Sequence, residues 1–346
     1  MKSSSELFPV SLLRADAFSG LTEDVYLVKH NRDPDLSVQV AVSHLGYQNK
    51  PHSGVPVILL HGSFNNRGFW LSGVGEGLAR HLLDQGFDVW MMDMRGHGMS
   101  PRNQDYRSNT QERYALYDLP AVAEFVHEKS GKAPVWLGHS LGGVTIAAAV
   151  AGGLLRDEKC SGMVIIAAQA IRRPMYQWVP FASLAARTRV NMKGELDGRK
   201  LGLGQEAEPA GIIDEYLARH SLFGAWQLAS TQQKLLPAWK DGTPVPLLAL
   251  AGEADRSEPV EYCSRFAALY GGDKTFIPLG TGSGLSQDYG HLDMMSGQTA
   301  GKEVWPQISD WLKATHYRSL NQKPESPHTS DGRCRGECPA SNAVRT

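Results

Sequence analysis

Ser140 stands at the centre of a G-x-S-x-G motif, residues 138–142. The motif follows an apolar run, 134–138, and precedes a segment rich in small residues, 141–155, so the sequence predicts a strand, a sharp turn and a helix. Flanking glycines leave room for the neighbouring strand and helix. The serine hydroxyl would then be exposed beside a helix N-terminus, which favours negative charge on a bound oxygen atom. The motif alone also fits an ordinary strand-to-helix turn, so the interpretation depends on its partners.

Two later residues could activate that serine. Asp255 lies just past the apolar run 246–251, and His291 lies past the run 275–279. Both are therefore expected at the carboxyl edge of the same sheet as Ser140, in the order serine, acid, histidine. The predicted roles are nucleophile for Ser140, general base for His291 and orienting acid for Asp255.

Other acids are close enough in sequence to be considered. Glu253 and Glu258 are alternatives to Asp255, whereas Asp288 and Asp293 flank the histidine too closely to reach its outer nitrogen.

Acyl chemistry at a serine also needs donors for the developing oxyanion. One expected donor is the backbone N–H of Leu141, directly after the nucleophile. The second is expected from Ser63, with Phe64 as the alternative, because His61-Gly62 ends the apolar strand 55–60.

Four histidines, His61, His97, His139 and His291, are predicted to gather at this edge of the sheet. A metal site is conceivable there, but three of them sit in turns that the fold itself explains, and the acid-rich ligand set of metal hydrolases is not evident. We therefore expect no metal and no cofactor.

The remaining pattern places these residues on an α/β scaffold. Short apolar runs alternate with helical periodicity, which predicts a mostly parallel sheet covered by helices on both faces. Segments 25–30 and 36–45 are expected to form an antiparallel hairpin. The expected helices are 76–85, one over 116–126 that ends before Gly131, 141–155, and 302–313 as the closing helix.

Segment 171–243 interrupts the alternation. It holds helical patches at 212–222 and 225–235 and many aromatic residues, so we expect a helical cap inserted into a core of residues 1–170 and 244–318. A polar tail, 319–346, is expected to be disordered. The expected substrate pocket combines the following aromatic residues: Phe64, His139, Trp178, Phe223 and Trp226.

These motifs together resemble the α/β-hydrolase superfamily of serine esterases and lipases. Residues 93–100 match the D-x-R-G-H-G-x-S loop of that family, and the resemblance covers about residues 25–316. Segments 87–90 and 290–293 are similar to acid lipases and to polyhydroxyalkanoate synthases. Those synthases use a cysteine nucleophile, so Ser140 favours hydrolysis or serine-based acyl transfer over polymerisation. The resemblance implies the α/β-hydrolase fold. We expect Asp93 and Arg95 to brace the loop beneath the site rather than to act on substrate.

The predicted function is a serine carboxylic ester hydrolase that acts on a neutral ester with an apolar arm. Thioester hydrolysis, lactone opening and serine acyl transfer use the same residues and stay open. Two alternatives belong to other classes of function. The chain could be a binding protein that has kept the fold and lost the chemistry, or a hydrolase whose tail serves mainly in assembly.

Composition limits the partners. The net charge of -1 gives no basic surface for nucleic acid, and 42% hydrophobic residues allow a full core. The longest apolar run, 144–155, is shorter than the roughly 20 residues that span a bilayer. No secretory signal is evident in residues 1–10, so a cytoplasmic location is expected. Cys160 and Cys263 are expected as buried thiols, with Cys334 and Cys338 in the tail.

Overall fold

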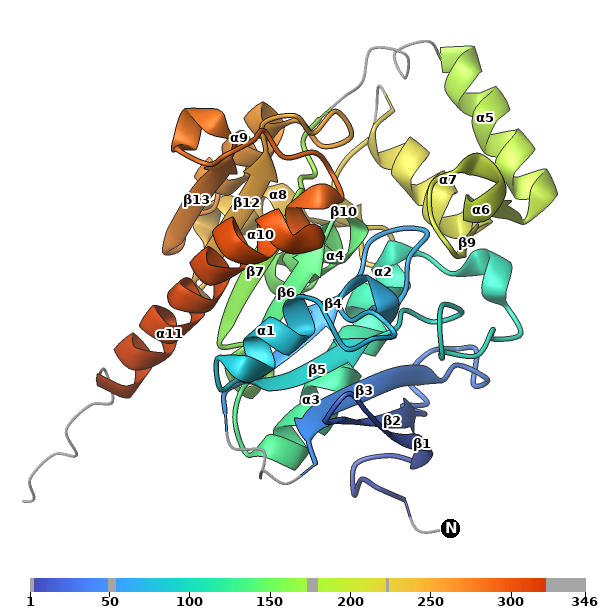
Figure 1. Cartoon of the computed structure of the whole chain (residues 1–346). Helices are drawn as coiled ribbons and strands as arrows, with labels where there is room; N and C mark the ends of the chain where they lie inside the picture. The colour runs from blue at the N-terminus through green and yellow to red at the C-terminus, as the bar shows by residue number, and fades with distance from the viewer. Residues whose placement is uncertain (1–2, 49–53, 173–179, 222–223, 322–346) are drawn as a thin grey trace, which may run out of the picture.

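The structure is a computed structural model that describes residues 3–48, 54–172, 180–221 and 224–321 (Figure 1). Its main feature is a nine-stranded sheet in the order β1-β2-β3-β5-β4-β6-β7-β12-β13. The strands are β1 (Val10–Phe18), β2 (Leu21–Val28), β3 (Val40–Tyr47), β4 (Pro56–Leu60), β5 (Asp88–Met92), β6 (Val135–His139), β7 (Gly162–Ile166), β12 (Leu247–Gly252) and β13 (Lys274–Leu279).

The sheet is antiparallel at one end and parallel over the rest. β1, β2, β3 and β5 pair antiparallel, and the strands from β5 to β13 pair parallel to one another. The predicted mostly parallel sheet is thus confirmed. β1 was not predicted from the sequence, and it extends the hairpin of β2 and β3 to the edge of the sheet.

Helices bury both faces of the sheet. In β4, Ile58 and Leu60 belong to the apolar cluster formed with α3 (Leu119–Ser130) and α4 (Leu141–Ala151). Their neighbours Val57 and Leu59 belong to the opposite cluster, formed with α1 (Leu78–Asp84) and α11 (Trp305–Asn321). Since alternate residues of a strand point to opposite faces, a strand buried on both sides must be apolar throughout.

Glycine and proline set two of the helix boundaries. α3 ends at Gly131, which takes the left-handed φ of 68°. This is the predicted cap, because glycine adopts that conformation without the penalty a side chain brings. The closing helix differs from the prediction and consists of α10 (Gly297–Glu303) and α11. Pro306 lies in the first turn of α11, where its missing N–H leaves no helical hydrogen bond unmade. Its ring would clash with a helical turn before it, so α10 ends and a separate helix begins.

The other core helices are short. They are α2 (Gln111–Arg113), followed by a π-helical turn at Tyr114–Asp118, and α9 (Val260–Ala268). Cys160 and Cys263 are buried free thiols, and burial raises the pKa of Cys160 to about 12. Cys334 and Cys338 lie outside the described residues, as does the rest of the tail from 322 on. Across the described ranges, no helix is both long and apolar enough to cross a membrane.

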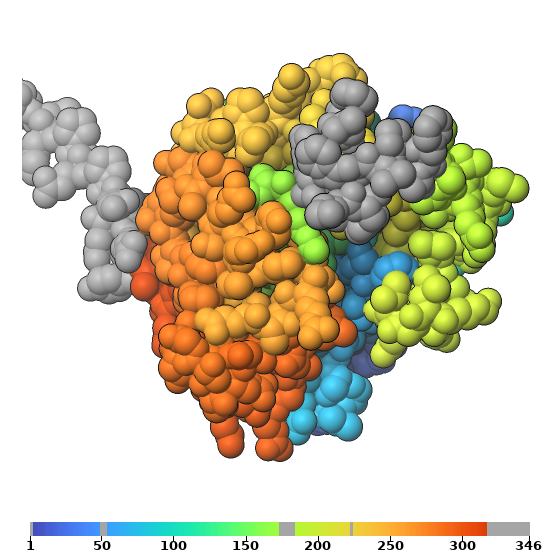
Figure 2. All heavy atoms as spheres, turned by 90° about the horizontal axis from the view of Figure 1, so that it is seen from above, coloured from blue at the N-terminus to red at the C-terminus, as the bar shows by residue number. Residues whose placement is uncertain are grey.

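Within the segment between β7 and β12, residues 180–219 stand beside the main body, whereas residues 235–241 pack against α4 (Figure 1). From above, the yellow-green part of this segment and the orange C-terminal part flank a green and blue surface (Figure 2). Its described elements are α5 (Pro180–Lys193), β8 (Glu195–Asp197), α6 (Gly198–Leu201), β9 (Ala207–Pro209), α7 (Ala210–Arg219), β10 (Gln227–Leu228), β11 (Gln233–Lys234) and α8 (Leu235–Asp241).

The helix predicted over 225–235 is wrong. β10 and β11 pair there as a small antiparallel ribbon, and α8 begins only at Leu235. The chain reverses at Gln232, which has a left-handed φ of 55°, and Leu235 N–H then donates to the Trp226 carbonyl at 2.9 Å. Trp226 packs edge-on against Trp239 of α8, with ring centroids 5.9 Å apart, so tertiary packing favours the reversal over a helix.

Candidate active site

Ser140 lies at the junction of β6 and α4. Its φ of 52° and ψ of −120° fall in a region that side chains rarely adopt, and its N–H donates to the Ile166 carbonyl at 2.9 Å. The flanking glycines are needed for close packing. A Cβ on Gly142 would lie 2.4 Å from the Leu60 carbonyl oxygen, and one on Gly138 would lie 2.6 Å from the Gly142 backbone. The motif thus forms a strained strand-turn-helix corner.

His291 bridges Ser140 and Asp255. Its Nε2 lies 3.1 Å from Ser140 Oγ, and its Nδ1 lies 2.7 Å from Asp255 Oδ2. Asp255 follows β12 and His291 follows β13, so three separate strand ends bring the side chains together. The Asp255 side chain is fully buried, whereas that of His291 is 22% exposed and can reach a substrate. This geometry allows the imidazole to take the serine proton while the carboxylate fixes its tautomer.

The loop that carries Asp255 holds the carboxylate in place. Asp255 Oδ1 accepts hydrogen bonds from the N–H groups of Ser257 (2.8 Å) and Glu258 (3.0 Å), which leaves Oδ2 for the imidazole. The alternative acids have other partners. Glu258 Oε2 accepts from Gln169 Nε2 at 2.6 Å, and Glu253 Oε2 accepts from Gly282 N–H at 3.4 Å.

The two acids that flank His291 in sequence, Asp288 and Asp293, do not contact its ring nitrogens. Asp288 Oδ1 accepts from the N–H and hydroxyl of Thr281, at 2.7 and 2.8 Å. Asp293 begins a short 3₁₀ turn (Asp293–Met295) directly after the histidine. Of the five acids considered from the sequence, Asp255 is the one in hydrogen-bond contact with His291.

The residues after His61-Gly62 lie against the nucleophile. A Cβ on Gly62 would be 3.0 Å from Ser140 Cβ, so the backbone that leads to Ser63 passes directly beside the serine. Leu141 is the first residue of α4, and its N–H therefore has no acceptor within the helix. Phe64, the alternative donor, has a left-handed φ of 60°, and its N–H donates to Glu208 Oε1 at 2.7 Å. That N–H is already engaged, which favours Ser63.

Glu206 and Glu208, around β9, were missed from the sequence. Glu208 is fully buried, and besides the Phe64 N–H its Oε1 contacts His97 Nε2 at 3.2 Å. Glu206 N–H donates to the Phe64 carbonyl at 2.9 Å, and its carboxylate accepts from Asn66 Nδ2 at 2.5 Å. The segment between β7 and β12 thus clamps the loop that follows β4. No local pattern marks this pair, because its partners lie more than a hundred residues earlier.

The other histidines at this edge serve the fold. His61 Nε2 accepts from Met94 N–H at 3.0 Å, and burial lowers its pKa to about 3. His139 Nε2 contacts the His291 carbonyl at 2.7 Å, and burial, then the neighbouring His291, lower its pKa to about 3. Burial disfavours a charged His97, but the Glu208 carboxylate and a backbone hydrogen bond outweigh it, so the pKa of His97 is raised. Within the described ranges, no three acidic, cysteine or histidine side chains form a group that could hold a metal ion.

Asp93 and Arg95 brace the loop below the serine. Asp93 accepts hydrogen bonds from the N–H groups of Arg67 (2.6 Å) and Met99 (2.8 Å). Arg95 is fully buried and pairs with Asp118 and, at 2.7 Å, with Asp33. Both side chains are therefore committed to the protein, as the sequence suggested.

The five predicted pocket residues divide into four groups. Phe64 is partly buried, and its ring packs against Gly198, where a Cβ would lie 2.8 Å from its Cδ1. His139 is buried beside His291, with ring centroids 4.6 Å apart, and also packs against Phe69, which the sequence did not suggest. Trp226 packs with Phe266, at a centroid distance of 5.2 Å, and lies in the apolar core. Trp178 and Phe223 lie outside the described residues.

Comparisons with known proteins agree with the fold. A family model described as "alpha/beta hydrolase fold" matches residues 55–197. The tear acid lipase-like protein of Mesocricetus auratus is 31% identical over 140 residues, which are 37% of this chain and 32% of that protein. Human gastric triacylglycerol lipase is 32% identical over 138 residues, with the same two shares. The chain spans about a third of the length of these curated relatives.

Solved structures extend the likeness to most of the chain. A thermophilic esterase from Thermogutta terrifontis superposes with a TM-score of 0.57 at 20% identity, covering 84% of this chain and 99% of that one. A putative aryl esterase from Burkholderia cenocepacia gives a TM-score of 0.51 at 19% identity, covering 85% and 100%. The chain has the α/β-hydrolase fold.

Proposed function

We propose that this chain is a serine carboxylic ester hydrolase that works through an acyl-serine intermediate. The observation that supports this best is the single hydrogen-bonded row from Ser140 through His291 to Asp255, with Ser140 at a strained corner. The relatives and structural neighbours named as lipases and esterases support the ester as substrate class.

In the first half of the proposed reaction, His291 Nε2 takes the proton of Ser140 as Oγ bonds to the ester carbonyl carbon. The carbonyl oxygen becomes an oxyanion, which the N–H groups of Ser63 and Leu141 stabilise. The carbon–oxygen bond to the leaving alcohol then breaks, and the alcohol takes the proton from His291. Asp255 stabilises the imidazolium throughout and does not itself take up the proton.

In the second half, water attacks the acyl-Ser140 carbonyl carbon. His291 accepts the water proton and returns it to Ser140 Oγ as the acyl–oxygen bond breaks, which releases a carboxylic acid and regenerates the enzyme. A neutral ester with an apolar arm remains the proposed substrate, and the segment 171–243 is the proposed cap. A cytoplasmic location is part of the same proposal.

A panel of p-nitrophenyl esters from acetyl to palmitoyl, run on wild type and Ser140→Ala, tests the proposal. We expect a clear chain-length optimum and a loss of kcat of at least about a thousandfold in the variant. Ser161→Ala is the matched control, because its hydroxyl is exposed and donates only to the Ala133 carbonyl. Equal turnover in Ser140→Ala and wild type would contradict the proposed nucleophile.

The same assay separates the alternatives. Cleavage of thioesters or lactones without cleavage of any oxygen ester would move the proposal to those substrates on the same three residues. A chain that neither cleaves esters nor reacts with a serine-directed phosphonate would instead be a binding protein of this fold.

A further inference from the structure

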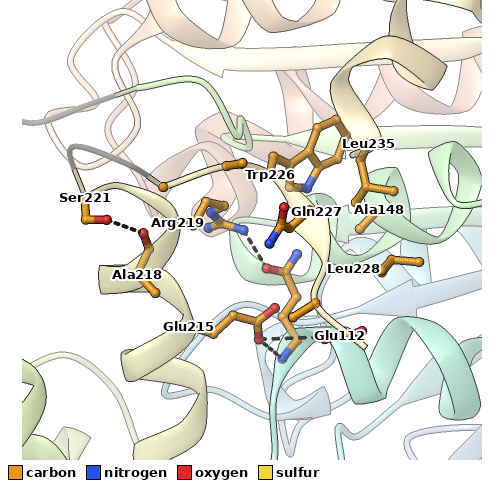
Figure 3. Close-up of a pocket in the computed structure, with 14 residues that line it drawn as sticks. Glu112, Ala148, Glu215, Ala218, Arg219, Ser221, Trp226, Gln227, Leu228 and Leu235 are labelled. Carbon is orange, nitrogen blue, oxygen red and sulfur yellow. Dashed lines mark hydrogen bonds between the residues drawn. The ribbon is translucent and has the colours of Figure 1, made fainter. Parts of the chain in front are cut away.

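Arg219, the last residue of α7, lines a cavity of about 290 Å³ (Figure 3). One guanidinium nitrogen, Nη1, donates to Gln111 Oε1 at 2.6 Å, and the cation sits 5.6 Å from the Tyr216 ring centre. The buried Nε has no hydrogen-bond acceptor, and no carboxylate of the described chain forms an ion pair with Arg219. The carboxylates of Glu215 and Glu258 attract the guanidinium from a longer distance, but the Nε of Arg219 still has no acceptor, so a donor remains for a further acceptor.

Two further donors without a partner belong to residues that line the same cavity. Gln111 is 4% exposed and Trp226 is 8% exposed, and Gln111 Nε2 and Trp226 Nε1 are both buried with no acceptor among the described residues. Figure 3 shows the Arg219 and Trp226 side chains on the same side of the cavity lining, above Glu215. Buried N–H groups in proteins almost always have a partner, so three orphan donors around one cavity call for an acceptor ligand.

Two acids line this cavity, and both have partners. Glu112 Oε1 accepts a hydrogen bond from the Ser230 N–H at 2.8 Å. Glu215 accepts hydrogen bonds from the N–H groups of Gln111 (2.6 Å) and Glu112 (3.4 Å), at the N-terminus of α2. Its carboxylate therefore satisfies backbone donors of the core. It attaches α7 to α2 and leaves the Nε of Arg219 without an acceptor.

A second cavity of about 320 Å³ adjoins the first and shares Arg219 and Trp226 with it. Arg172 and Lys234 also line it, and none of its described lining residues is acidic. Its other lining is apolar: Ala170, Ile171, Leu236 and Pro237. Positive charge next to an apolar wall suits a molecule with an anionic head and a hydrocarbon arm.

We propose that the two adjoining cavities form a second binding site, which takes a small organic carboxylate with an apolar arm. The carboxylate accepts hydrogen bonds from Arg219, Gln111 and Trp226, in the manner in which guanidinium groups recognise carboxylates. The arm lies against Leu235 and Leu228 in the first cavity or the apolar wall of the second. Each cavity is near the lower limit of ligand pockets, about 300 Å³, which selects a small molecule. The site shares no residue with the proposed triad and does not depend on the proposed function.

Titration of the full chain with sodium hexanoate tests the site. The readout is the indole N–H signal of Trp226 in ¹H–¹⁵N spectra, assigned by its disappearance in Trp226→Phe, together with calorimetric affinity. We expect hexanoate to shift that signal in wild type and equally in Ser140→Ala, because the site is separate from the triad. Arg219→Met should weaken the affinity at least about tenfold.

Two controls isolate the charge and the position. Arg187→Met removes another arginine of the insertion, one that pairs with Asp214 at 2.7 Å and lines neither cavity, and should bind hexanoate as wild type does. Hexanol, which has the same arm without the charge, should bind at least about tenfold more weakly. Unchanged affinity in Arg219→Met, equal binding of hexanol, or no shift of the Trp226 signal with hexanoate would each overturn the site. If Arg219→Met fails to fold, the shift of the Trp226 signal in wild-type spectra with hexanoate still tests the proposed site.

Discussion

Glu208→Gln tests how the insertion holds the loop beside the nucleophile. The buried Glu208 carboxylate accepts the Phe64 N–H at 2.7 Å and contacts His97 Nε2 at 3.2 Å. Glutamine has nearly the same shape, and its amide oxygen can accept both contacts because both are made to Oε1, but it removes the negative charge. The substitution therefore weakens the clamp without opening a cavity.

The size of the effect follows from the two contacts. A hydrogen bond to a charged group contributes about 1.5–3 kcal/mol and a neutral one about 0.5–1.5 kcal/mol. Losing the charge on Glu208 should therefore lower the free energy of unfolding by about 2 kcal/mol. Removing an oxyanion donor costs roughly a hundredfold or more in kcat. Because Ser63 N–H is displaced rather than deleted, we expect kcat to fall about tenfold, with KM little changed.

The difference in the free energy of unfolding between wild type and Glu208→Gln should depend on pH, because His97 titrates. Its pKa is raised in the folded chain, so the folded state holds the proton more tightly than the unfolded state does. The stabilisation that protonated His97 gives to the folded chain is complete below the pKa of about 6.5 that histidine has in the unfolded chain. It is lost as the pH rises through the raised pKa of His97 in the folded chain. Glu208→Gln removes the main favourable partner of the cation, so its destabilisation should be larger at pH 6 than at pH 9.

Urea unfolding at these two pH values, with ester kinetics at each, measures both effects. Glu195→Gln is the matched control, since Glu195 is an exposed acid of the same insertion that pairs with Arg102 at 2.8 Å. It should alter neither quantity by much. If Glu208→Gln lowers the stability but leaves kcat as in wild type, the clamp does not position the oxyanion donors. If neither changes, the charge on Glu208 has no role.

Two further substitutions probe the packing and charge around the triad. Gly142→Ala would place its Cβ 2.4 Å from the Leu60 carbonyl oxygen and should lower the free energy of unfolding by about 3 kcal/mol in chemical denaturation, whereas Gly73→Ala meets nothing within 4 Å and should change it little. Burial raises the pKa of Glu258 to about 7, so the buried carboxylate destabilises the folded chain above that pH. Glu258→Gln should therefore stabilise the chain at pH 8, by up to about 3 kcal/mol, and hardly at pH 5; equal melting temperatures at pH 8 would contradict this.

The parallel core could be predicted because its strands are buried on both faces. Residues 55–60 form an unbroken apolar run, and such a run has few other stable places in a protein. β1 escaped prediction because it is an edge strand with much of its surface exposed, including Leu12 and Leu13, and its pairing with β2 leaves little signal in its own sequence. The ribbon β10–β11 escaped because the packing of Trp226 on Trp239 determines it.

The candidate site was predictable to a similar degree. Ser140, Asp255 and His291 each follow a recognisable strand, so their order and position could be read along the chain, and the structure brings them into contact. Glu206 and Glu208 could not be anticipated. They lie in and next to the short strand β9, and their importance arises only from the loop at Phe64 that they meet after folding.

The insertion leaves the sheet after β7 and returns at β12, and these two strands are direct neighbours. Sequence between them can therefore lengthen, shorten or be exchanged in evolution without changing the order of the strands or the positions of the three strand ends. The exchange is not free, however, because Glu208 and Glu215 attach this segment to the core at the Phe64 loop and at α2. A transplanted insertion would need to bring equivalent carboxylates with it, so this region can diversify only together with its two anchor points.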